Sequence, residues 1–88
     1  MIAKPYYKVV RISDDYLAVP VGNAADSIHG IIALSETAAF VLNKMEKPIT
    51  REELIEVLLS EYDVERETVE SDLDSILRTF LELELIEP

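Results

Sequence analysis

The repeat of apolar residues changes near the middle of this chain of 88 residues. Before Leu34 the apolar residues are largely β-branched or aromatic and alternate or form short runs, which is typical of strands. After Ser35 they recur every three or four residues, which is typical of helices that bury one face. Because the strands come first and the helices second, the sequence predicts an α+β fold, with a small antiparallel sheet packed on a helical bundle.

Three strands are expected in the first part of the chain. Residues 6–12 and 16–21 flank the turn-forming sequence Ser-Asp-Asp and are predicted to form a hairpin. Pro20 has no N–H to donate, so it should lie at a strand end or where its nitrogen faces no partner. Residues 28–34 are expected to form the third strand, which is an edge strand in a simple meander.

Two helices are predicted from their end signals. Ser35 is a suitable N-cap for a helix that runs to about residue 47, where Pro48 stops it. The sequence Ile-Thr-Arg-Glu-Glu-Leu then places Thr50 as an N-cap and Glu53 three residues later, which is the pattern of a capping box. A second helix is therefore expected to begin directly after Thr50.

A third helix is expected over residues 66–83. Its apolar residues recur at alternating steps of four and three, so that one side of the helix should be buried. These residues are Val69, Leu73, Ile76, Phe80 and Leu83, and the stripe is widened by Leu77 and Leu81.

Length and composition indicate one globular domain over residues 1–88. A chain of this size supports a single core, and 49% hydrophobic with 30% charged residues is typical of a folded domain. There is no cysteine, no signal sequence and no apolar run that could span a bilayer, so a cytoplasmic protein is expected.

The net charge of −10 lies entirely in residues 46–88, because basic and acidic residues balance in residues 1–45. Binding to DNA or RNA needs clustered Lys and Arg, and the four basic residues of the second part stand among acids. Nucleic acid and anionic membrane surfaces are therefore not expected as partners.

No residue pattern predicts a catalytic site, a metal site or a cofactor. His29 is the only histidine, and a lone histidine without a second ligand is far more often structural than metal-binding. Gly22 and Gly30 are the only glycines, so there is no glycine-rich phosphate loop. The serines lack the context of an activated nucleophile, and an enzyme acting alone is the least favoured function.

The third strand is apolar and carries no feature that protects a free edge. Lysine, proline or a bulge normally blunts an edge strand, because its open N–H and C=O groups recruit other strands. The sequence Ile-His-Gly-Ile-Ile-Ala-Leu contains none of these. The edge is therefore expected to pair with a second copy of the chain or with an extended peptide that adds as a strand.

Four segments in this order resemble the PqqD-like proteins, the recognition elements for precursors of ribosomally made, modified peptides. The segments are YLAVPVG, GIIALSETAAFVL, TREELIEVLLSEYDVERETVESDL and LELELIE, and the resemblance extends from about residue 8 to residue 87. The chain departs from the family pattern where Ser35 replaces an asparagine. It also lacks two glycines common in relatives, at Lys47–Pro48 and at Glu84.

The resemblance implies a three-stranded, three-helix domain of winged helix-turn-helix type without catalytic activity or cofactor. It implies binding of the leader segment of a precursor peptide, which adds as a strand beside the third strand and is presented to a modifying enzyme, often a radical SAM protein. The implied main-chain partners are Ile28, His29, Gly30, Ile31, Ile32 and Ala33. The implied groove-facing residues of the third helix are Asp72, Ser75, Ile76 and Thr79.

Alternatives stay open at this level. Asp72 could instead bond to a nearby main-chain group or to Arg78, and Ile76 could be a core residue. For the whole chain, the main alternative is a homodimeric structural or regulatory protein of winged-helix type without a peptide substrate. A DNA-binding regulator is compatible with the fold but is opposed by the charge.

Overall fold

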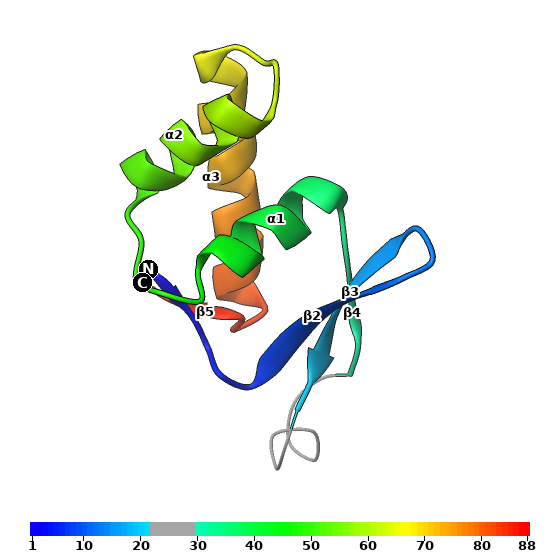
Figure 1. Ribbon diagram of the computed structural model, residues 1–88. Helices are drawn as coiled ribbons and strands as arrows, with labels where there is room; N and C mark the ends of the chain where they lie inside the picture. The colour runs from blue at the N-terminus through cyan, green and yellow to red at the C-terminus, as the bar shows by residue number, and fades with distance from the viewer. Residues whose placement is uncertain (22–29) are drawn as a thin grey trace.

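A three-stranded antiparallel sheet and three helices make up most of the fold, as predicted. The computed structural model describes residues 1–21 and 30–88, and Figure 1 shows the helices gathered on one side of the sheet. The sheet has the order β2–β3–β4, with β4 at an edge. Its strands are β2 Tyr7–Ile12, β3 Asp15–Pro20 and β4 Ile32–Leu34, and the helices are α1 Glu36–Lys44, α2 Arg51–Glu61 and α3 Arg66–Glu82.

The hairpin of β2 and β3 is confirmed, and its turn is tight. Ile12 pairs with Asp15, so Ser13 and Asp14 alone form the loop. Ser13 has φ 58°, the left-handed conformation that two-residue hairpin turns require. The Arg11 Nε donates a hydrogen bond of 3.0 Å to the Ser13 carbonyl oxygen, which stabilises the turn.

The two ends of the chain form a second, very short sheet that the sequence did not predict. β1 Ile2–Ala3 pairs antiparallel with β5 Ile86–Glu87, and the termini lie close together (Figure 1). The Ala3 N–H also donates to the Met45 carbonyl oxygen at 2.8 Å. Strands of two residues have no readable periodicity, so only the fold brings them together.

The first two helices begin where their caps predict. The Ser35 hydroxyl accepts the Ala38 N–H at 3.0 Å, and Thr50 with Glu53 forms both halves of a capping box. α1 ends at Lys44, three residues before the expected end, because the Met45 N–H bonds back to the Leu42 carbonyl and tightens the last turn. Met45, the residue that follows the helix, is fully buried.

α3 ends in a Schellman motif, in which two N–H groups after the helix bond back to its last turn. The Leu85 N–H donates to the Phe80 carbonyl at 2.8 Å, and the Glu84 N–H donates to the Leu81 carbonyl at 3.2 Å. Glu84 has φ 59°, a conformation that favours glycine. The missing glycine noted in the sequence therefore falls at the one helix end where its conformational freedom is needed.

The core lies between the three helices and the inner face of the sheet. α3 contributes Val69, Leu73, Leu77 and Phe80, which are all buried, whereas Ile76 is half-buried. Leu81 is 45% exposed and Leu83 36% exposed, so these two residues of the predicted stripe lie outside the core. None of the described helices is long and apolar enough to cross a membrane.

Candidate functional site

One main-chain position of β4 faces the open edge of the sheet. The Val21 N–H donates to the Tyr6 carbonyl at 2.9 Å, so the main-chain groups of Val21 point toward the β2 side. This direction alternates from residue to residue along a strand, so the main-chain groups of Tyr16 and Ala18 point the other way, toward β4. Their partners there are Leu34 and Ile32. In an antiparallel ladder the residue between two such partners directs its N–H and C=O outward. That residue is Ala33, which lies at the edge of the sheet.

β4 is shorter than the strand expected over residues 28–34. Gly30 and Ile31 are described and precede the strand, while Ile28 and His29 lie outside the described residues. The register places Pro20 opposite Gly30 as the next hydrogen-bonded pair, and Pro20 cannot donate. Pairing therefore stops at Ala18 and Ile32, and Ile31 is left 64% exposed.

A groove lies between β4 and the C-terminal half of α3. It has a volume of about 260 Å³. Its floor includes the buried side chains of Ala38 and Phe80, which are 8% and 1% exposed. The residues that line it are Ile32, Ala33, Leu34, Ser35, Ala38, Ser75, Ile76, Thr79, Phe80 and Leu83. The groove is mainly apolar and runs along the open edge of β4.

Most of the predicted site residues that the structure describes line this groove. Ile32 and Ala33 do so from β4, and Ser75, Ile76 and Thr79 from α3. Phe80 and Leu83 were not proposed as site residues, although their places in the apolar stripe of α3, four and seven residues after Ile76, could have indicated them. Leu34, Ser35 and Ala38 complete the lining because α1 follows β4 directly.

Asp72 lines a different hollow, of about 100 Å³, between the three helices. Ile76 lines both hollows, so that the second continues the groove toward the N-terminal half of α3. Among residues 1–21 and 30–88, no hydrogen bond or ion pair is made by Asp72, so neither a main-chain group nor Arg78 binds it.

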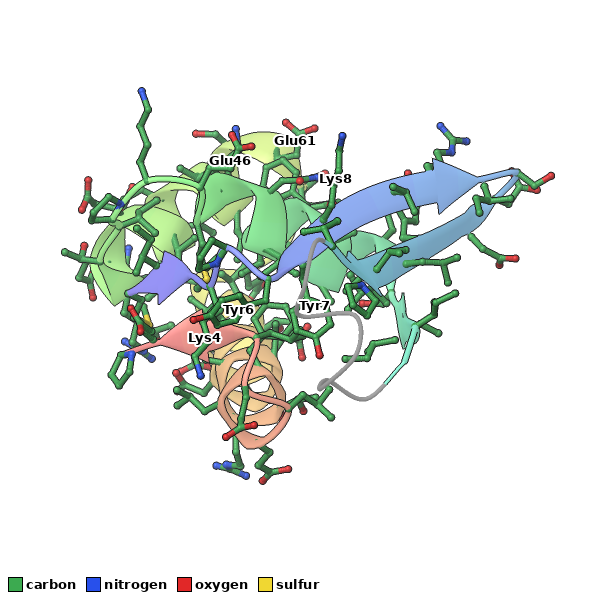
Figure 2. All side chains as sticks on the ribbon, turned by 90° about the horizontal axis from the view of Figure 1, so that it is seen from below. Lys4, Tyr6, Tyr7, Lys8, Glu46 and Glu61 are labelled. Carbon is green, nitrogen blue, oxygen red and sulfur yellow. The ribbon has the colours of Figure 1, made fainter. Side chains whose placement is uncertain are left out.

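The other edge of the sheet is a less suitable place for an added strand. The hollow beside β2 has a volume of about 300 Å³ and is lined by Lys4, Lys8 and Glu46 together with apolar residues. Figure 2 shows Lys4 and Tyr7 on one side of this region and Lys8 and Glu46 on the other. Lysine near an edge strand opposes the approach of another strand, because its charge would be desolvated.

Arg66, Glu70 and Asp74 of α3 are paired on the surface. Arg51 binds Asp74 through two hydrogen bonds of 2.8 and 3.0 Å, and these hold the pKa of the Asp74 carboxyl below its usual value. Arg66 binds Glu52 at 2.8 Å and also contacts Glu70. In the part of the chain that the structure describes, no group of three or more His, Cys, Asp or Glu residues could hold a metal ion.

The sequence of residues 16–86 matches the family model described as coenzyme PQQ synthesis protein D (PqqD). The chain belongs to the PqqD family. This match covers β3 from its second residue, the edge strand β4, all three helices and the start of β5, and therefore the whole of the groove in this PqqD-family chain. No curated protein matches the chain.

The solved structures include a similar fold. It is a chain from "TbiB1 in Complex with the TbiA(beta) Leader Peptide", which is 24% identical in sequence and superposes with a TM-score of 0.77. The similarity covers 99% of this chain and 95% of that one. The PqqD-family chain therefore shares the whole fold of that protein.

Proposed function

We propose that this chain recognises the leader segment of a ribosomally made precursor peptide by adding it as a strand at the edge of β4. The open main-chain position at Ala33 beside an apolar groove is the observation that carries this proposal. Membership of the PqqD family supports it, and so does the shared fold with TbiB1, which was solved in complex with a leader peptide. The chain acts as one domain and catalyses no reaction itself.

The bound leader is presented to a peptide-modifying enzyme, and a radical SAM enzyme is the partner we favour. The binding has to be reversible for this role. Main-chain hydrogen bonds at about 0.5 to 1.5 kcal/mol each and two buried apolar side chains at about 1.5 to 3 kcal/mol each exceed the cost of ordering the peptide only modestly. We therefore expect a reversible complex and take a dissociation constant on the order of micromolar as the working expectation.

Calorimetric titration with the leader of a small precursor peptide, if one is found encoded beside this protein, tests the proposal. A peptide of the same composition in scrambled order is the control, because it carries the same charge and hydrophobicity. We expect micromolar binding of the leader alone, with amide NMR shifts at Ala33 and at the groove residues Ile76 and Thr79. Absence of binding to that leader would refute the proposed function.

The alternative of a homodimer paired through the same edge makes a different prediction. β4 has three residues, so two copies would share a short ladder between two acidic molecules. Sedimentation of the free protein should give a monomer, and the complex with the leader should still contain one protein chain. A dimer that survives dilution and excludes the leader would favour the alternative.

A further inference from the structure

The hollow beside Asp72 has an apolar interior and a polar rim. Leu58, Val69 and Leu73 are buried and close its inner side, whereas Val64 is 46% exposed at its mouth. The remaining lining residues are Thr37, Tyr62, Asp72 and Ile76. A long aliphatic chain could lie against the apolar wall while its polar end reaches the rim.

Asp72 is exposed and, among residues 1–21 and 30–88, has no counter-charge, and unlike the equally unpaired Glu67 and Glu82 it lines this hollow. Asp74 is bound to Arg51, and Glu70 lies 3.4 Å from Arg66, whereas Asp72 makes no such contact. No lysine or arginine lines either this hollow or the groove next to it. The carboxylate is therefore free to pair with a positive charge that a bound molecule brings.

The other polar groups fit the same kind of ligand. Thr37 and Tyr62, which both carry hydroxyl groups, belong to the lining with Asp72, and these side chains are of the types that accept hydrogen bonds from an ammonium or guanidinium group. An acidic side chain would be repelled by Asp72 and by the net charge of −10. The lining therefore favours a basic side chain over an acidic or a purely apolar one.

The position of the hollow next to β4 indicates that the leader peptide supplies this basic side chain. β4 leads through Ser35 into α1, whose residue Thr37 lines the hollow, so the hollow lies just beyond the C-terminal end of β4. Ile76 is shared with the groove, and Asp72 lies four residues before it, about 6 Å along α3. Two or three residues of extended chain, at roughly 3.3 Å each, span this separation.

We propose that the hollow beside Asp72 binds a lysine or arginine of the leader, two or three residues from the leader residue that contacts Ile76. This inference rests on the proposed function, since it requires a peptide strand at β4. It adds a charge requirement to a site that otherwise selects only for an extended, apolar segment. Asp72 thereby sets which leader is accepted and in which register it lies along β4.

Selection from a displayed library of random dodecapeptides tests the inference and does not require the leader to be identified first. The wild-type protein and the Asp72→Asn variant are each used as bait. Glu82→Gln is the matched control, because Glu82 is an exposed acid of the same helix that lines neither hollow. Both substitutions remove one negative charge, and circular dichroism should give the same melting temperature for all three proteins.

We expect wild-type binders to carry lysine or arginine at a fixed spacing from an apolar residue. For one such peptide, Asp72→Asn should weaken binding about fivefold, as for a partly exposed ion pair. Replacing the peptide lysine by norleucine should cause the same loss, and the two changes together should cause no further loss. Glu82→Gln should leave the affinity within about twofold.

The inference is overturned if wild-type binders show no basic residue at a fixed spacing. It is also overturned if Asp72→Asn weakens binding no more than Glu82→Gln does. If the wild-type protein selects no peptides at all, the proposed function fails, and this outcome is distinct from the other two.

Discussion

Replacing Ala33 by proline should weaken strand addition strongly while leaving the fold intact. Ala33 is the β4 residue whose N–H faces the open edge, and its side chain is exposed. Its neighbours Ile32 and Leu34 pair with β3, so the ladder within the sheet does not use the Ala33 N–H. Proline is tolerated at an edge position of this kind, because its ring fits an extended backbone and no internal hydrogen bond is lost.

The size of the effect follows from the groups that Ala33→Pro leaves without a partner. One hydrogen bond to the guest strand is lost, worth about 0.5 to 1.5 kcal/mol, and the guest carbonyl that it served is desolvated without a donor, at about 1 to 3 kcal/mol. A net loss of about 2 kcal/mol corresponds to roughly 30-fold weaker binding. A micromolar complex would be left with a dissociation constant of about 30 μM, which calorimetry can still measure.

Calorimetry with the leader, combined with thermal melting, measures both parts of this prediction. Ala33→Val is the matched control, because it keeps the N–H and favours a strand, and it should bind the leader within about threefold of the wild-type protein. A leader that is N-methylated at the residue opposite Ala33 lacks the N–H that the Ala33 carbonyl accepts, so it tests the other hydrogen bond of the same pair with the protein unchanged. If Ala33→Pro melts normally and binds with undiminished affinity, strand addition at β4 is wrong.

Three further predictions concern stability and charge. Thr50→Ala should lower the free energy of unfolding by about 1 kcal/mol in urea denaturation, whereas Thr50→Ser should retain most of it, and peptide binding should not change. Glu84→Gly should raise the free energy of unfolding by about 0.5 to 1 kcal/mol, because it relieves a left-handed conformation; a loss of stability would show that the Glu84 side chain is needed. NMR titration should give Asp74 a pKa below its ordinary value, and Arg51→Gln should return it toward that value. Since folding lowers this pKa, the stabilisation by the Arg51 pair is present above the unfolded pKa of Asp74 and is lost as the pH falls through the folded pKa. If Arg51→Gln leaves the loss of stability at acid pH unchanged, the pairing is contradicted.

The edge position of the third strand was predicted correctly, but its length was not. The apolar sequence before Ser35 indicated a strand back to residue 28, whereas β4 starts at Ile32. The cause lies in a different strand, because Pro20 offers no donor at the place where Gly30 would pair. The strand propensity of residues 28–34 says nothing about which N–H donors the opposite strand offers. The first residue of β4 could therefore be found only once the register between β3 and β4 was known.

The groove was predicted in part. Ile76 and Thr79 were inferred from family resemblance and line the groove, but Asp72 was expected in the same place and lines the neighbouring hollow. Residues 72 and 76 are one turn apart on the same side of a helix, and sequence spacing does not separate the two hollows that they border. The division between them depends on where α1 and α2 pack against α3.

The sequence by itself determined the order of strands and helices, the hairpin turn, the start of α2 at its capping box and the concentration of negative charge in the second part of the chain. These features follow from interactions between residues close together in the chain, or from composition, and so they can be read locally. The tertiary structure alone decided the pairing of β1 with β5, the extent of β4 and the separation of Asp72 from the groove. Each of these depends on contacts between segments far apart in the sequence, whose energies no local pattern records.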